Sequence, residues 1–413
     1  MIKREKIKNF FEYILGLSII LEANSVYSQI YGLHKIIRTC MVIVVCFSLL
    51  ILLLLRKNKL TKKNAIVILI DYLISIIMYF NTNNITGKGV ILLVFDSFLP
   101  LMYLYLDKLS KEEIINFLKK IVNIIVIICC ISLVFYFFSS VIKILKPTNT
   151  IKILWGKPYS EIDSFFYLHF NTQVIYWVTN SPLIRNTGIY TEGPMYALVL
   201  VTGLMINCLI IDEKNKYSYI KSLIIIVTTI TTFSFTGILC IGIVLLIYIF
   251  NLYQVGNKKQ KVSMIIITIT IIFILTPLMI SFTEKKMATS SASHRRMDFI
   301  NGINAFKDSP LIGKGINHKK PDELNPEEGY GYSNAIIPVM TDGGIILLSF
   351  YIIPFVIVLM FSIKNRHKKY ILFEIVFFIL LLTTQFQYRL LMILMILLQY
   401  NVPRIERRKE INK

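Results

Sequence analysis

The chain has 413 residues, of which 55% are apolar and only 17% are charged, whereas roughly 25% of the residues in a soluble domain are charged. Its formal net charge of +21 comes from Lys and Arg residues in short clusters between apolar runs, and a nucleic-acid-binding protein would gather them on one polar surface. The composition therefore excludes an ordinary soluble domain and predicts a membrane protein that crosses the bilayer many times.

Apolar segments long enough to cross a bilayer recur along the chain. A membrane-spanning helix needs about 20 apolar residues, and length and periodicity place twelve segments at residues 10–28, 39–55, 65–80, 89–106, 121–142, 194–211, 222–234, 236–251, 263–281, 334–361, 371–384 and 387–402. The regions 222–251 and 371–402 would each overshoot the hydrocarbon core as one helix. Polar residues such as Ser234 and Gln385 interrupt their centres, so we expect a pair of short helices in each region.

Basic residues test this count, because short cytoplasmic loops carry the excess of Lys and Arg. With the N-terminus in the cytoplasm, the inner segments hold the clusters Lys3–Lys8, Arg56–Lys63, Lys108–Lys120, Lys214–Lys221, Lys258–Lys261, Lys364–Lys369 and Arg404–Lys413. The short outer loops hold only Lys35, Arg38, Lys88 and Arg389. The sequence thus predicts an all-α, polytopic integral membrane protein with about twelve transmembrane helices and both termini in the cytoplasm.

Residues 1–413 form a single membrane domain in this interpretation, with two long outer loops at 143–193 and 282–333. Neither loop has a strong strand pattern. All six cysteines lie within apolar runs, and no Cys or His spacing suggests a metal site, so we expect no disulfide bond, metal or other cofactor. The basic N-terminus is followed by an apolar run that Glu12 and Glu22 interrupt, which favours a retained first span over a cleaved signal peptide.

The first outer loop is rich in aromatic residues and ends in a polar motif. Trp155 and Trp177 fit either an aromatic belt at the membrane interface or flat faces on which sugars stack, and Tyr190 lies in the motif that follows. Arg185 and Glu192 stand at the mouth of the next span, where they could form a structural ion pair. Alternatively, the planar and always charged guanidinium of Arg185 could hold a diphosphate in a bidentate manner.

The second outer loop belongs to a polar, basic and glycine-containing segment at residues 294–349. Arg295 and Arg296 stand at the start of this segment. The apolar residues of 296–307 recur at helical spacing and predict an amphipathic helix lying on the membrane. Lys314 follows between two glycines that permit close backbone approach. Cations held at a membrane surface favour an anionic or lipid-linked substrate.

Four ionisable residues lie within or next to the predicted spans. Asp71, Asp96, Glu374 and Arg389 are costly to insert into lipid, so we expect them to face the interior of the helix bundle. Asp71 and Asp96 could form a proton relay. A transporter is therefore an alternative interpretation of the chain.

Several short motifs follow one another in order between residues 180 and 350. They are Arg185-x-x-Gly188, Glu192-x-Pro194, Ser234-Phe-Thr-Gly237, Arg296-x-x-Phe299, Ser309-Pro310 through Gly313-Lys-Gly315, and Asn334 through Asp342-Gly343-Gly344. Their order and spacing, together with the layout of the spans, resemble the O-antigen ligase and polymerase superfamily. Its nearest branch comprises the polymerases of surface and capsular polysaccharide.

The resemblance implies a glycosyltransferase of the bacterial cytoplasmic membrane. It would join oligosaccharide repeat units of O-antigen or capsule, carried on a polyprenyl diphosphate such as undecaprenyl diphosphate, at the outer face of that membrane. In the family, arginines of the outer loops hold the diphosphate, and the matching positions here are Arg185 and Arg296, with Arg295 adjacent. We add Lys314 to this diphosphate site, and we assign the sugar site to Trp155, Trp177, Tyr190 and Asn334.

The implied reaction is attack by a sugar hydroxyl on an anomeric carbon, with lipid diphosphate leaving. Paired arginines can stabilise the leaving charge without a metal, and Glu192 is our first candidate for the base, with Asp298 second. Ligases of the family commonly carry a His where this chain has Ser333, and this difference counts against a ligase. The alternatives are an O-antigen-type ligase and a lipid-linked oligosaccharide flippase or transporter. A chain-length regulator and a flippase are candidate protein partners, and no nucleic acid is expected.

Overall fold

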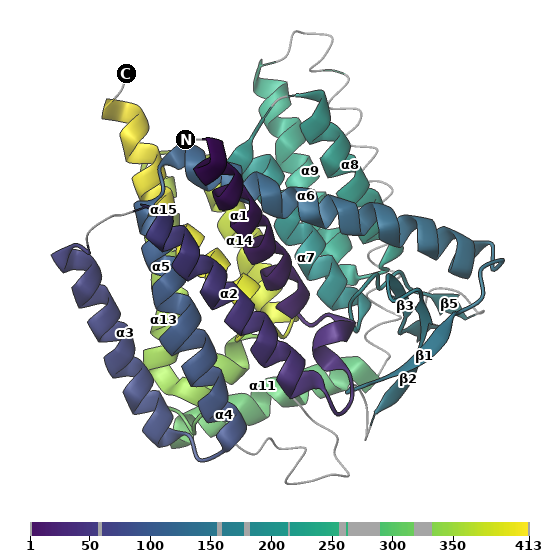
Figure 1. Cartoon of the computed structure of the whole chain (residues 1–413), viewed down its shortest axis with the longest axis horizontal. Helices are drawn as coiled ribbons and strands as arrows, with labels where there is room; N and C mark the ends of the chain where they lie inside the picture. Colours follow the sequence, from purple (N-terminus) through teal and green to yellow (C-terminus); the bar gives the residue numbers. More distant parts are fainter. Residues whose placement is uncertain are drawn as a thin grey trace.

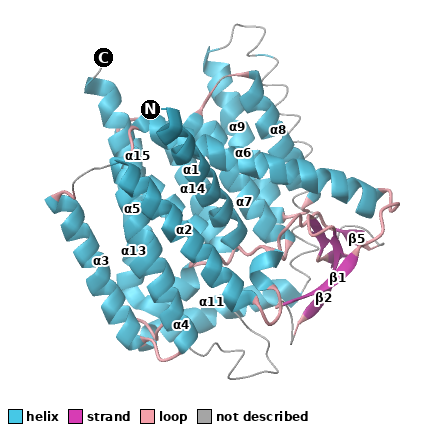
Figure 2. Ribbon diagram, in the orientation of Figure 1, coloured by secondary structure: helices cyan, strands magenta, loops and turns pink. Residues whose placement is uncertain are grey.

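The computed structural model describes residues 2–56, 60–154, 159–176, 182–213, 215–255, 262, 290–317 and 333–411. Helices make up most of this part of the chain, and two small antiparallel sheets lie on one side of the helix bundle (Figure 2). The expectation of a predominantly α-helical membrane protein is confirmed. The sheets were not expected.

The first helices form one side of the bundle. Helix α1 (Ile2–Glu22) packs against α2 (His34–Arg56), with the short 3-10 helix η1 (Val26–Gln29) in the turn between them. Helix α3 (Lys62–Asn81) begins where the Thr61 side chain accepts a hydrogen bond from the Asn64 amide, a usual N-cap arrangement. The connection between α1 and α2 is short, and it brings the end of α1 next to the start of α2.

The next helical segments are continuous through changes in helix type. Helix α4 (Ile85–Val90), the π-helical η2 (Ile91–Phe98) and α5 (Leu99–Lys108) together make one rod. A Ser110–Glu113 capping box starts α6 (Lys111–Tyr136), which η3 (Phe137–Val141) extends toward the first long loop.

The first long loop contains five short strands. Strands β1 (Asn149–Ile153), β2 (Ser160–Phe165) and β3 (His169–Asn171) form one antiparallel sheet, and β4 (Val174–Ile175) pairs with β5 (Leu183–Ile184). The sequence of this loop shows no strong strand pattern because strands of two to six residues are too short to display clear alternation, so the strands were not predicted. Cross-strand pairing, as between Lys152 and Glu161, supplies what the local pattern lacks.

The helices of the second half of the chain confirm both predicted interruptions. Helix α7 (Gly193–Met205), extended by η4 (Ile206–Ile211), precedes α8 (Lys216–Thr231) and α9 (Phe235–Val255), which residues 232–234 separate. Helix α13 (Ile336–Lys364) is followed by α14 (Lys368–Thr383) and α15 (Leu390–Ile411), and residues 384–389 separate the last two. Polar side chains break each region near the expected place.

The number of membrane spans stays a prediction. Among the described residues, six helical segments are long and apolar enough to cross a bilayer, namely His34–Arg56, Lys62–Asn81, Ile85–Lys108, Lys111–Val141, Gly193–Ile211 and Ile336–Lys364. Phe235–Leu246 and Leu390–Val402 are shorter apolar helices. The predicted span 263–281 lies outside the described residues. The structure thus supports a multi-pass membrane protein, but it does not confirm a count of twelve.

The bundle has two distinct ends. Helix α1 begins and α15 finishes at the same end, and helix α11 (Ser290–Asp308) lies across the opposite end (Figure 1). We call this opposite end the loop end, because the α1–α2 turn and the α14–α15 connection also lie there. An amphipathic helix across one end was expected for residues 296–307, and α11 includes all of them.

Candidate functional site

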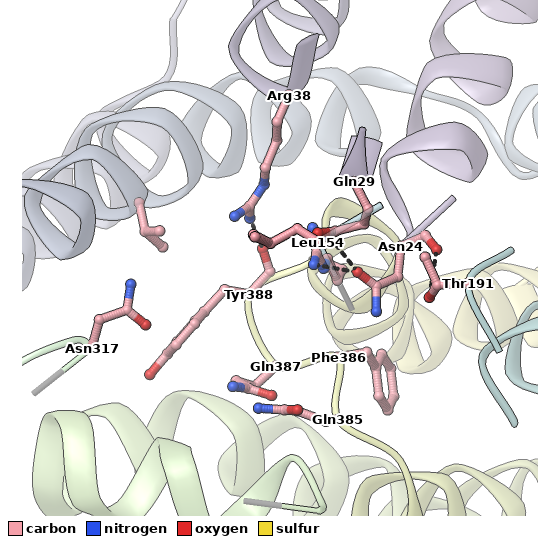
Figure 3. Close-up of a pocket in the computed structure, with 12 residues that line it drawn as sticks. Asn24, Gln29, Arg38, Leu154, Thr191, Asn317, Gln385, Phe386, Gln387 and Tyr388 are labelled. Carbon is pink, nitrogen blue, oxygen red and sulfur yellow. Dashed lines mark hydrogen bonds between the residues drawn. The ribbon is translucent and has the colours of Figure 1, made fainter. Parts of the chain in front are cut away.

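A polar pocket of about 370 Å³ opens at the loop end of the bundle (Figure 3). Its walls come from five separate parts of the chain: the α1–α2 region, the end of α4, the two long loops and the α14–α15 connection. The lining residues are Asn24, Gln29, Arg38, Val90, Leu154, Thr191, Asn317, Gln385, Phe386, Gln387, Tyr388 and Arg389. Amide, hydroxyl and guanidinium groups dominate this set, which suits a hydrophilic ligand.

Two arginines of the pocket share one buried carboxylate. Glu22 at the end of α1 is fully buried, and its Oε1 accepts hydrogen bonds from Arg38 Nε at 2.8 Å and from Arg389 Nη1 at 3.1 Å. Its Oε2 accepts from the Leu390 amide at 2.9 Å. One negative charge therefore faces two positive charges, and the cluster carries a net charge of +1.

The arginine side chains keep donors for a ligand. A guanidinium has five N–H donors, and Arg38 uses two of them within the described part of the chain, toward Glu22 and the Tyr388 carbonyl. Arg389 also donates from Nη2 to Asn24 Oδ1 at 2.6 Å, an oxygen that Gln29 shares. Arg38 is 27% exposed and Arg389 is 16% exposed. Both cations are held in place and still reach the pocket.

The loop that follows α11 is packed against α13 and leads to the lining residue Asn317. Residues 309–315 lie directly on a kink in α13, where Gly344 has φ +59° and the Lys314 and Gly315 amides donate to the Thr341 and Asp342 carbonyls. A Cβ on Gly313 would lie 2.4 Å from the Asp342 carbonyl carbon. The glycines found in the sequence motifs therefore allow two backbones to touch.

The turn between α3 and α4 holds the same loop from the other side. Asn81 Nδ2 donates to the carbonyls of Ile312 and Gly313, and Asn84 Nδ2 donates to those of Ile316 and Asn317. These bonds fix the loop backbone up to the residue that enters the pocket. Asn317 is therefore a positioned lining residue.

Arg185 is buried beside the start of α7. Its Nε and Nη2 donate to the Thr232 and Phe233 carbonyls in the α8–α9 turn, at 2.7 and 3.2 Å, and its Nη1 donates to Gln173. Burial lowers the pKa of the Arg185 guanidinium to about 10, against the opposing charge of Glu192, so the group stays charged at neutral pH. Arg185 thus joins β4–β5, α7 and the α8–α9 turn.

The segment after Arg185 reaches the pocket. Thr191 lines it and donates through its amide to the Asn24 carbonyl at 3.4 Å, while Tyr190 is fully buried and stacks on Tyr196 with ring centroids 5.1 Å apart. Glu192 is half-buried at the residue before α7. The structure therefore brings the Arg185 motif to the pocket wall through Thr191.

The remaining residues predicted from the second polar segment occupy different environments. Arg296 is exposed on α11, whereas Asp298 is buried there. Lys314 pairs with Asp308 at 2.6 Å. Asn334 is buried, and its Oδ1 accepts a hydrogen bond from the Ile337 amide in the first turn of α13. Trp155, Trp177 and the side chain of Arg295 lie outside the described part of the structure.

Tyr388 connects the cationic side of the pocket with an acidic group. Its carbonyl accepts from Arg38 Nη2 at 3.2 Å, and its hydroxyl donates to Asp342 Oδ2 at 2.6 Å. In Figure 3 the Tyr388 ring points away from the Arg38 guanidinium. Opposite parts of Tyr388 therefore contact a cation and a carboxylate.

Sequence reasoning missed the cluster of Glu22, Arg38 and Arg389 as a site. Each residue carried a signal: Glu22 interrupts an apolar run, Arg389 was expected to face the bundle interior, and Arg38 is one of few cations in the short outer loops. No local pattern relates them, because they lie on three different helices or connections. Only packing brings them together.

The described geometry defines a multi-pass helical membrane protein with a cation-bearing polar pocket where several loops meet. The family model described as O-antigen ligase matches residues 220–352 and confirms, for that segment, the resemblance to the O-antigen ligase and polymerase superfamily. No curated protein and no solved structure matches the chain. Among the lining residues named above, only Asn317 lies within the matched segment.

Proposed function

We propose that the protein is a polymerase of surface or capsular polysaccharide that joins oligosaccharide repeat units carried on a polyprenyl diphosphate. The transfer takes place in the pocket at the loop end, which faces the outside of the bacterial cytoplasmic membrane in this proposal. The observation that carries it is the pair Arg38 and Arg389, which share Glu22 and both line a polar pocket. The match to the O-antigen ligase family gives the reaction class.

The reaction requires stabilisation of a leaving diphosphate. When the bond between the anomeric carbon and the phosphate oxygen breaks, negative charge accumulates on the diphosphate. Fixed cations in a partly buried site lower the energy of that state, because they need little reorganisation during the reaction. The net charge of the cluster is positive even with Glu22 included, so it favours an anion.

The residues proposed from the sequence keep roles in this scheme. Arg296 is exposed on α11 and is available for a diphosphate approaching along the membrane surface. Lys314, in the loop that follows α11, and Arg295 stay in the proposal as further cations for the diphosphate. Arg185 holds the backbone that leads to Thr191 in the pocket wall. Glu192 was the first candidate for the base, and Asn334, Trp155 and Trp177 stay candidates for contacts with the sugars. Tyr190 is fully buried against Tyr196, so it supports the pocket wall instead of contacting a sugar.

A polymerase is favoured over a ligase by one residue of the second polar segment. Ser333 stands where ligases of the family commonly carry a His, and a hydroxyl with an ordinary pKa is a poor substitute for imidazole as a base at neutral pH. A flippase would need to carry its substrate through the bundle. The pocket instead lies at one end of the bundle, where several loops and connections meet, and this favours transfer over transport.

Reconstitution of the whole protein into liposomes tests the proposal. The substrate is a lipid-linked repeat unit bearing a fluorescent label, and we expect a ladder of products that grow by one repeat unit. A single transfer to a different lipid acceptor would identify a ligase. Movement of the unmodified substrate across the bilayer without new products would identify a flippase. Either result would overturn the polymerase assignment.

A further inference from the structure

Tyr388, which lines the pocket, is hydrogen-bonded to the buried carboxylate of Asp342. Asp342 is 6% exposed, and it lies at the α13 kink, immediately before the glycine pair whose second member has φ +59°. Its carbonyl accepts from the Gly315 amide at 2.9 Å, so the loop at 309–315 fixes its backbone. A carboxylate held this way can keep one oxygen directed at the Tyr388 hydroxyl.

Tyr388 is fixed at both ends. Arg38 binds its carbonyl, Asp342 accepts its hydroxyl proton in a 2.6 Å hydrogen bond, and its ring packs edge-on against Phe95 with centroids 6.2 Å apart. The neighbouring residue Gln387 is held separately, because its carbonyl accepts a hydrogen bond from the Tyr351 hydroxyl. The phenol therefore has a defined place in the pocket wall.

We propose that Tyr388 and Asp342 form the proton-accepting pair that activates the acceptor sugar hydroxyl. This inference rests on the proposed function. It deepens that function, because it places the acceptor at the Tyr388 side of the pocket and the diphosphate at the Arg38 and Arg389 side. Tyr388 is the catalytic residue that touches the acceptor, and Asp342 acts through it.

The step balances as follows. The acceptor oxygen forms a bond to the anomeric carbon while the bond from that carbon to the diphosphate oxygen breaks. The acceptor's proton passes to the Tyr388 oxygen as the phenolic proton passes to Asp342 Oδ2. The electron pair of the broken bond leaves with the lipid diphosphate, beside Arg38 and Arg389. No oxidant, reductant or metal takes part in the balance.

The environment of Asp342 distinguishes it from Glu192. Glu192 lies just before α7, and its charge acts on the buried guanidinium of Arg185. Asp342 instead accepts from the neutral phenol of a pocket-lining residue. Neither Asp298, on α11, nor Asp342 is among the lining residues, but Asp342 is hydrogen-bonded to Tyr388, which is one of them.

The test compares Tyr388→Phe and Asp342→Asn with Tyr105→Phe in the liposome assay. Tyr105→Phe is the matched control, because it also removes a buried tyrosine hydroxyl that donates to a carboxylate, here Glu12 Oε1 at 2.5 Å, and neither of these two residues lines the pocket. Single-turnover rates, binding of the labelled lipid-linked repeat unit and thermal stability are measured for every variant. Loss of a general base typically slows a reaction by roughly 10²–10⁴-fold.

We expect both pair variants to lose transfer by about 100-fold or more while substrate binding and folding persist, and we expect the control to remain active. Asp342→Ala supplies a second readout, since added formate should restore part of its rate if a missing proton acceptor is the defect. A variant that merely unfolds would not respond to formate.

Two results would overturn the pair and are distinct from failure of the proposed function. Normal transfer by Asp342→Asn and Tyr388→Phe in an assay where the unaltered protein makes a ladder would refute the pair alone. The same holds if Glu192→Gln abolishes transfer and Asp342→Asn does not. If the unaltered protein makes no ladder, the polymerase proposal fails, and the pair, which depends on it, fails with it.

Discussion

Glu22 and Arg389 are 367 positions apart in the chain, yet Arg389 Nη1 donates to Glu22 Oε1 at 3.1 Å. This ion pair joins the end of α1 to the residue before α15, and Glu22 Oε2 also accepts the Leu390 amide. The first and last helices are thereby closed against each other at the loop end. The pocket depends on that closure, because its lining includes Asn24, just after α1, and Arg389, just before α15.

Replacement of Glu22 by Gln should destabilise the protein. Removing one member of a buried ion pair costs about 3–5 kcal/mol, because Arg38 and Arg389 would then face each other without a carboxylate. Thermal unfolding of the detergent-solubilised protein measures the effect. The control Glu213→Gln breaks an ion pair whose carboxylate is 41% exposed, which should cost about 0–1 kcal/mol. Equal unfolding temperatures for the two variants would contradict the buried cluster.

Replacement of Arg38 by Ala should weaken substrate binding more than folding. Glu22 would still be paired with Arg389, while the pocket would lose the cation with most unused donors. Hydrogen bonds to charged groups contribute about 1.5–3 kcal/mol, so the Kd for the lipid-linked repeat unit should rise roughly 10–100-fold. Lys35→Ala, an exposed cation on the same helix, is the control. A similar Kd in both variants would argue against Arg38 as an anion ligand.

Replacement of Gly344 by Ala should disrupt the α13 kink. The residue has φ +59°, and an added Cβ would lie 2.5 Å from the Leu311 carbonyl. Backbone strain and displacement should lower the free energy of unfolding by at least about 1–3 kcal/mol, which thermal unfolding measures. Transfer activity should be lost as well. Gly89→Ala is the matched control, since a Cβ there meets nothing within 4 Å. An unchanged Tm for Gly344→Ala would show that the kink tolerates a side chain.

The pH dependence of stability should report on His169 in the three-stranded sheet. Its ring lies 6.2 Å from that of Phe135, and burial lowers the pKa of His169 from 6.5 to about 4. Between these values the unfolded chain binds more protons, so stability is complete above pH 6.5 and falls as the pH drops toward 4, by up to about 3 kcal/mol.

The variant His169→Phe isolates this effect. It keeps an aromatic ring against Phe135 but cannot titrate, so its stability should decline less over the same interval. Thermal unfolding between pH 7 and pH 4.5 makes the comparison, and parallel pH profiles of the two proteins would show that His169 is not the titrating group.

Arg185 and Arg296 should fail in different ways. Arg185→Lys loses the geometry of three hydrogen bonds in a buried site, so both stability and polymer length should decrease. Arg296→Ala removes an exposed side chain and should reduce the amount of polymer, while the free energy of unfolding changes by no more than about 0.5 kcal/mol. Single repeat units should accumulate on the lipid carrier. Normal chain lengths in both variants would refute the assignment of these arginines.

The helices were predictable because their causes are local. Apolar length locates α2, α3 and α13, and polar residues near Ser234 and Gln385 end helices where they would otherwise continue. The small sheets were missed, since strands of two to six residues depend on partners brought from elsewhere in the loop. Arg185 was identified from its motif. Its hydrogen bonds to the α8–α9 turn could not be predicted, because that turn lies more than 40 positions away in the sequence.

The sequence alone determined that this is a membrane protein of apolar helices, because insertion into lipid depends on the apolar residues of each segment. It also shows a motif order typical of one superfamily, in which glycines permit turns within short stretches of chain. Tertiary structure decided which charged groups meet. Glu22, Arg38 and Arg389 converge, and Tyr388 reaches Asp342, only after four helices and their connections have packed. The energy of such contacts depends on distance in space and on exclusion of water, and neither is recorded in the order of residues.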